Sequence, residues 1–185
     1  MKRTNLLILL ISAFLIIFSN YSNAQRYYNN ALGLSGGIYS ASGFGTNPYF
    51  ALRYDHFFNS KKFFFEASYG IGSLESKVLN NLGGFQLFDS NKLQSYEFLM
   101  AYDGNPGGNI PFIIAGVAGI NQGGQSVFSY IIGIGKHIPL GQFFDTDRFG
   151  IRYDVRDQIF KQTLNTDNSY ISHNLIFTLG LQLYF

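Results

Sequence analysis

The last twelve residues, 174–185, alternate between large apolar side chains and small or polar ones, with Ile176 as the one exception. The apolar positions of this alternation are Leu175, Phe177, Leu179, Leu181, Leu183 and Phe185. Successive side chains of a β-strand point to opposite faces, so the stretch predicts a strand with one continuous apolar face. A helix cannot produce a period of two residues, so the C-terminal part of the chain favours a β fold.

Seven further segments have β-type sequences, and six of them repeat this alternation. The predicted strands cover residues 32–39, 50–55, 65–72, 95–102, 111–120, 128–135, 149–156 and 174–185. Because single-chain bacterial barrels have an even number of strands, we predict an all-β fold, a closed antiparallel eight-stranded up-and-down transmembrane β-barrel. Segment 111–120 is apolar on both faces, so the sequence does not show which of its residues point into the barrel.

The N-terminus has the layout of a cleaved secretory signal. Lys2 and Arg3 precede an almost wholly apolar run over residues 6–18, and Ser22 and Ala24 place small side chains before a cut at Gln25. The alternative, a membrane anchor helix, needs about 20 apolar residues, and this run is shorter. We therefore predict a signal peptide over residues 1–24 and one mature β-barrel domain over residues 25–185.

Composition narrows the function classes. Without Lys2 and Arg3 the chain has 11 basic and 11 acidic residues, a balance that argues against nucleic acid as a partner. Charged residues make up 13% of the chain, against about 25% in an ordinary soluble domain. The chain has no cysteine, which excludes disulfides and a lipid-modified N-terminal cysteine. No mature segment is apolar enough for a membrane helix, so a membrane location requires a closed barrel.

The alternation alone does not decide which face of the barrel is outside. A lipocalin-type barrel also has eight strands, with its apolar side chains inside. Here the polar-side positions are mostly Gly, Ser, Ala and Thr, and an eight-stranded barrel is only wide enough to be filled by side chains. Enclosing every apolar row would overpack it and leave an insoluble, charge-poor surface. We therefore predict that bulky apolar residues face lipid while small and charged residues line the interior.

The connections between the predicted strands sort into two groups by length. Residues 59–61, 103–109 and 139–146 form the expected periplasmic turns, although the last is long for such a turn. Residues 73–90 and 158–170 form the expected extracellular loops, with the short connection 122–125 as an exception on that side. Short turns at one end and longer loops at the other are typical of outer-membrane barrels.

The signal peptide, the eight strands and the terminal sequence LQLYF at 181–185 resemble the small outer-membrane barrels of the OmpA transmembrane-domain and OmpX type. Residues 150–157, GIRYDVRD, resemble the penultimate strand of a broad group of "outer membrane β-barrel domain" proteins. The resemblance implies a monomer in the bacterial outer membrane, exported through the periplasm and surrounded by outer-membrane lipids. It also implies that Phe185 is the signal read by the barrel assembly machinery. A peptidoglycan-binding domain, and hence a cell-wall tether, is not expected.

Seven charged residues fall on the small-residue face of the predicted strands. They are Arg53, Asp55, Glu66, Glu97, Arg152, Asp154 and Arg156. Unpaired buried charge is costly, so we predict that they form a hydrogen-bonded ion-pair network. Such a network could be a selectivity filter or gate. We favour a structural plug, because eight strands leave no continuous aqueous channel.

The sequence predicts no catalytic, cofactor-binding or metal-binding site. The histidines are scattered over positions His56, His137 and His173. Ser172-His173-Asn174 does not have the His-x-Ser-Asn order of the outer-membrane lipid A deacylases, and neighbouring strand residues face opposite sides. No His, Cys, Asp or Glu cluster has metal-ligand spacing, and Gly123-Gly124 indicates a hairpin rather than a phosphate loop.

Three functions are consistent with this sequence. The one we favour is a non-enzymatic integral outer-membrane barrel with a structural or surface-interaction role, whose extracellular ligand is unknown. A narrow pore for ions or small solutes is the first alternative. A lipid A-modifying enzyme is the second.

Overall fold

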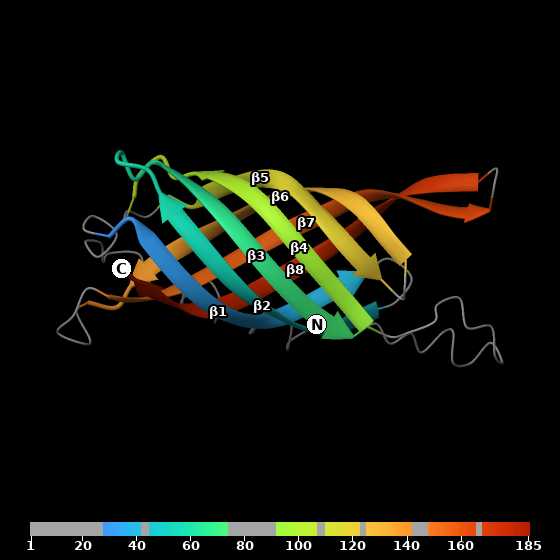
Figure 1. Ribbon diagram of the computed structural model, residues 1–185, viewed down its shortest axis with the longest axis horizontal. Helices are drawn as coiled ribbons and strands as arrows, with labels where there is room; N and C mark the ends of the chain where they lie inside the picture. Colours follow the sequence, from blue (N-terminus) through green and yellow to red (C-terminus); the bar gives the residue numbers. More distant parts are fainter. Residues whose placement is uncertain are drawn as a thin grey trace, which may run out of the picture.

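The protein is a closed antiparallel barrel of eight strands in the computed structural model, which describes residues 28–41, 45–73, 92–106, 110–122, 125–141, 148–165 and 168–185 (Figure 1). The strands are β1 (Asn30–Ala41), β2 (Gly45–Phe57), β3 (Phe63–Ser73), β4 (Lys92–Tyr102), β5 (Phe112–Gln122), β6 (Gln125–Pro139), β7 (Phe149–Asn165) and β8 (Asn168–Tyr184). Each contains its predicted segment or most of it, so the predicted fold class is confirmed. The predicted signal peptide lies outside the described residues.

Every strand pairs with its neighbours in sequence, and the barrel closes where β1 pairs with β8. In the closing ladder Leu34 lies opposite Leu181, and on its other side Leu34 lies opposite Leu52 of β2. Opposed residues share a face, so one apolar row continues around the barrel wall. No helix in the described part of the chain is long and apolar enough to cross a membrane.

The apolar rows face outwards and the charged residues face inwards. Leu34 and Leu181 are 67% and 64% exposed, whereas Arg152 and Asp154 are 2% and 0% exposed. This arrangement is the reverse of that in a water-soluble barrel, where the apolar residues fill the inside. The predicted orientation of the two faces is therefore confirmed.

The structure resolves the faces of β5, which the sequence left open. Phe112, Ile114 and Ile120 are buried inside the barrel, while Ile113 is exposed on the outer wall. The inward residues of β5 are thus as apolar as the outward ones, which is why no alternation could be read from this strand.

The barrel interior is more aromatic than the sequence predicted. One apolar cluster contains Phe57, Phe64 and Phe112, and a second contains Tyr39 and Tyr49. The expectation that only small and charged residues line the inside was therefore incomplete. Glycines on neighbouring strands leave room for these rings.

Two of these glycines show how the space is made. A methyl group at Gly70 would overlap the phenol of Tyr49, and one at Gly150 would lie 2.8 Å from the Tyr184 ring. A large inward residue is therefore accommodated where its neighbour has no side chain.

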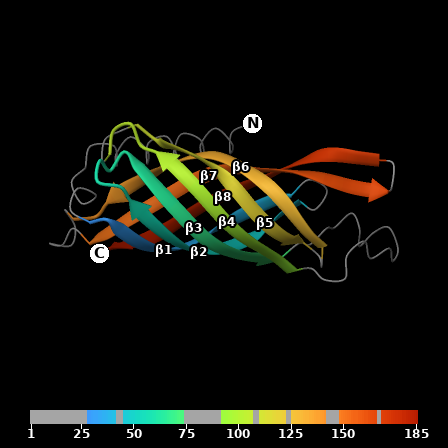
Figure 2. The same ribbon diagram turned by 45° about the horizontal axis from the view of Figure 1, so that its top comes forward.

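The prediction that residues 158–170 form a loop is wrong, because β7 extends to Asn165 and β8 begins at Asn168. The β6–β7 ladder ends at the pair Tyr130–Ile159 and the β1–β8 ladder ends at Ser40–Leu175. Beyond these pairs the ladder pairing of the described residues joins β7 and β8 only to each other, with a register shift between Thr163 and Asn165. The two strands form a ribbon that projects from the barrel at the end opposite the C-terminus (Figures 1 and 2).

Of the other predicted connections, the short turn over residues 59–61 is described in full and is confirmed as a turn. The turn over residues 59–61 follows β2, with Lys61 at φ 56° and its N–H donating to the Phe58 carbonyl at 2.7 Å. The connection 122–125 joins β5 directly to β6. Residues 74–91, 107–109 and 142–147 lie outside the described residues, and with them most of the predicted loop 73–90.

Candidate functional site

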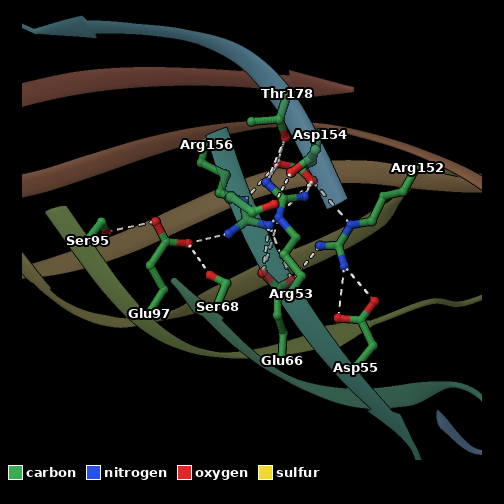
Figure 3. A network of polar contacts seen from close by, with 12 residues as sticks. Arg53, Asp55, Glu66, Ser68, Ser95, Glu97, Arg152, Asp154, Arg156 and Thr178 are labelled. Atoms are coloured by element: carbon green, nitrogen blue, oxygen red, sulfur yellow. Dashed lines mark hydrogen bonds and ion pairs between the residues drawn. The ribbon is translucent and has the colours of Figure 1, made fainter. Parts of the chain in front are cut away.

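The seven predicted charged residues lie together inside the barrel, between the two apolar clusters (Figure 3). Arg53 and Asp55 come from β2, Glu66 from β3, Glu97 from β4, and Arg152, Asp154 and Arg156 from β7. All seven are at most 3% exposed. They point inwards because they occupy alternate positions of their strands, on the face opposite the apolar rows.

Arg152 links β7 to the strands across the interior. Its Nη1 donates to both oxygens of Asp55, at 3.0 and 2.8 Å, and its Nη2 pairs with Glu66. Its Nε donates to Asp154 at 3.2 Å. The guanidinium also lies over the Phe112 ring, 5.0 Å from the centroid. The Arg152 side chain therefore contacts three carboxylates and an aromatic ring of the apolar cluster that contains Phe112.

Arg156 of β7 and Arg53 of β2 complete the network. Arg156 donates to Asp154 from Nε at 2.8 Å and to Glu66 from Nη2 at 2.9 Å, and its Nη1 pairs with Glu97. Arg53 pairs through Nη1 with Asp154. Each of the three guanidiniums therefore contacts Asp154, which lies at the centre of the charges.

Neutral donors supply the remaining hydrogen bonds of the carboxylates. Glu97 accepts from Tyr49 at 3.2 Å and from Ser68 and Ser95 at 3.0 Å each. Thr178 donates to Asp154 at 3.0 Å. These partners were not assigned from the sequence, although strand alternation places them on the inward face. Because the carboxylates are bonded on several sides, the network has a defined geometry.

His137 lies at one edge of the network and was given no role by the sequence. Its Nε2 is 3.7 Å from Asp55 Oδ2, and the imidazole packs against the rings of Phe64 and Phe112. Neither ring nitrogen forms a hydrogen bond with a described residue. The seven network residues comprise three guanidiniums and four carboxylates, and His137 is a second basic group next to Asp55, beside Arg152.

The network and its flanking clusters fill the interior. Along β2 the order is Tyr49, then Arg53 and Asp55, then Phe57, so the charges lie between two apolar layers. A cavity of about 10 Å³ beside Gly33 and Arg53 has room for a single water molecule.

Ser172 and His173 are consecutive residues of β8. Ser172 is buried in the interior, whereas His173 lies on the outer wall and bonds to Asp157. The prediction that the two would face opposite sides is confirmed. No group of three or more His, Cys, Asp or Glu among the described residues could hold a metal ion.

The fold is similar to those of solved bacterial barrels. The chain superposes over 85% of its length on 97% of the crystal structure of Neisserial surface protein A, with TM-score 0.54 and 14% identity. It superposes over 85% of its length on 98% of the N-terminal β-barrel domain of Pseudomonas aeruginosa OprF, with TM-score 0.52 and 15% identity. No protein-family model and no curated protein matches the chain. The resemblance drawn from the sequence is thereby confirmed at the level of the fold.

Proposed function

We propose that the protein is an integral β-barrel of the bacterial outer membrane with a structural or surface-interaction role and no enzymatic activity. The observation that carries the proposal is the reversal of the usual burial pattern. Leucine, isoleucine and phenylalanine rows cover the outside, and three arginines and four carboxylates are enclosed. Such a surface is stable in hydrocarbon and poorly compatible with water.

The height of the outer apolar surface supports this proposal. On β8 every outward residue from Leu175 to Phe185 is large, apolar and exposed. These ten steps cover about 33 Å along a strand, and about 25 Å along the axis of a barrel whose strands tilt by about 40°. An apolar band of about 25 Å is what an outer membrane requires.

The charged network supports a structural role rather than conduction. It connects β7 to β2, β3 and β4 across the interior through hydrogen bonds of buried groups. Ions passing through would have to displace both the network and the aromatic layers on each side of it. We therefore propose that the network is an internal cross-link that holds the barrel closed.

The route to the membrane is also part of the proposal. The predicted signal peptide over residues 1–24 directs export to the periplasm, and the C-terminal Phe185 is recognised by the assembly machinery. The protein then functions as a monomer, surrounded by outer-membrane lipids, and the ribbon of β7 and β8 lies on the extracellular side.

Fractionation and electrophoresis test the proposal. Full-length protein expressed in a Gram-negative host is expected in the outer-membrane fraction, with its gel mobility changed by boiling because the folded barrel resists detergent. Recovery in the soluble periplasmic fraction would contradict the proposal.

Two further measurements separate the alternative functions. Planar bilayers containing the refolded barrel are expected to show no discrete conductance steps, and steps would favour the pore. Mass spectra of lipid A are expected to be the same with and without expression, and a changed mass would favour the enzyme.

A further inference from the structure

A charged cluster lies on the outer wall of the ribbon end, away from the interior network. His173 Nδ1 and Asp157 Oδ2 are 2.8 Å apart, and the His173 side chain is 58% exposed. Exposed apolar residues surround the pair, with Ile132 and Leu175 directly beside Asp157 in the sheet. Charged groups on such a surface are costly in hydrocarbon and need a polar partner.

Lys161 belongs to the same outward face as His173. Their inward neighbours Phe160 and Ser172 are buried, so by alternation Lys161 and His173 both point outwards. Lys161 pairs with Ile171, two residues from His173 on β8. Diagonal neighbours of this kind are about 7–8 Å apart, a separation that one phosphate group can bridge.

The cluster lies at a defined level of the barrel. Outward residues of β8 are apolar from Phe185 up to Leu175, His173 is the next outward position, and Ile171 beyond it is again exposed and apolar. His173 therefore follows directly after the apolar band of about 25 Å. That is the level at which the head groups of the outer leaflet meet the barrel.

We propose that Lys161 and His173 bind the phosphate of an outer-leaflet lipid, and that Asp157 orients the imidazole. The proposal rests on the proposed function, because it requires the apolar band to lie in the membrane. Asp157 binds Nδ1 and so directs Nε2 to the opposite side of the ring. In the protonated imidazole Nε2–H donates to a phosphate oxygen while the Lys161 ammonium contacts a second one.

Recognition depends on the phosphate rather than on the acyl chains. Apolar residues beside the cluster, such as Ile132 and Leu175, contact acyl chains of any lipid in the same way. Two cationic donors on one face distinguish a phosphate-bearing head group from an uncharged one.

Native mass spectrometry of the full mature barrel in a neutral detergent tests the proposal. The probes are phosphatidylglycerol and, as an uncharged comparison, diacylglycerol with the same acyl chains. The wild-type barrel is expected to retain one phosphatidylglycerol and to bind diacylglycerol much more weakly. His173→Gln and Lys161→Gln are each expected to weaken phosphatidylglycerol binding about tenfold, the effect of losing one charge-assisted hydrogen bond.

Lys62→Gln is the matched control, because it removes an exposed lysine from the turn at the opposite end of the barrel. It is expected to bind like the wild type. Equal retention by the wild type and both cluster variants, or equal binding of the two lipids, overturns the proposal. Gel mobility before boiling is read for each variant, so a barrel that fails to fold is recognised separately. A failure of the proposed function shows instead as absence of the wild-type protein from the outer-membrane fraction.

Discussion

Replacement of Arg152 by methionine is expected to destabilise the barrel strongly. The guanidinium pairs with Asp55, Glu66 and Asp154, all fully buried. Without it, two guanidiniums face four carboxylates that are at most 1% exposed. Removing one partner of a buried ion pair costs about 3–5 kcal/mol, because the other charge is left uncompensated.

Methionine is chosen so that the contact with the aromatic cluster is largely kept and the charge alone is lost. A domain of this size loses about 2–4 °C in unfolding midpoint per kcal/mol, so the midpoint is expected to fall by about 6–20 °C. The assay is thermal unfolding in detergent, followed by circular dichroism and by the unboiled gel band. Arg148→Met is the control, because Arg148 is exposed in the turn before β7.

A second change tests whether the cause is charge. Adding Asp55→Asn and Glu66→Gln to the Arg152→Met variant neutralises Asp55, which has lost its guanidinium partner, and Glu66, which has lost one of several. Two guanidiniums then face two carboxylates, and part of the midpoint should return. A midpoint for Arg152→Met within about 2 °C of the wild type would refute the network as a source of stability. So would an Arg148→Met variant that is destabilised equally.

Three further substitutions test the interior packing, the membrane location and the assembly signal of the barrel. Gly70→Ala is expected to lower the unfolding midpoint, because the new methyl overlaps the Tyr49 phenol, whereas Gly119→Ala enters open space and should leave it unchanged. Leu179→Arg is expected to cost about 2–4 kcal/mol of stability in lipid bilayers, since Leu179 lies near the middle of the outward apolar band. Urea unfolding from vesicles measures this loss, and a variant as stable as the wild type would contradict the membrane assignment. Phe185→Ala is expected to reduce the amount of barrel assembled in cells while purified protein still refolds in detergent, and unchanged assembly would remove Phe185 from the recognition signal.

The barrel could be predicted from the sequence because every second side chain of most strands is apolar and faces outwards. This pattern can be recognised in one strand without knowing which strands lie beside it. Leu175, Phe177 and their successors are apolar for one reason, contact with the surroundings, and eight β-type segments, seven of them with this alternation, imply closure. The interior follows no comparable rule. β5 faces inwards with Phe112 and Ile114, which alternation alone cannot separate from its outward residues.

The same limit applies to the site. Alternation identified Arg53, Arg152 and Glu66 as inward, because charge on the apolar side would be exposed to lipid. It could not show that Arg152 pairs with Asp55, since β2 and β7 are not adjacent in the sheet. Contacts across the interior depend on strand stagger and tilt, which single-strand patterns do not contain. The neutral donor Tyr49, which reaches Glu97 of β4 from β2, was missed for that reason.

Stability and closure of the lumen depend on the same side chains. A conducting state would require the guanidiniums of Arg152 and Arg156 to separate from Asp154 and Glu66. It would also require the rings of Phe64 and Phe112 to move aside, because their apolar layer lies next to the charges along the barrel axis. Each buried pair that is broken without a new partner costs several kcal/mol, which is comparable to the whole stability of a typical domain. A substitution that opens the interior should therefore also lower the unfolding midpoint. A structural plug predicts that conductance and loss of stability appear together, whereas an independent gate does not. Simultaneous measurement of conductance and unfolding on the Arg152→Met variant separates the two, since conductance without loss of stability would require a path that bypasses the network.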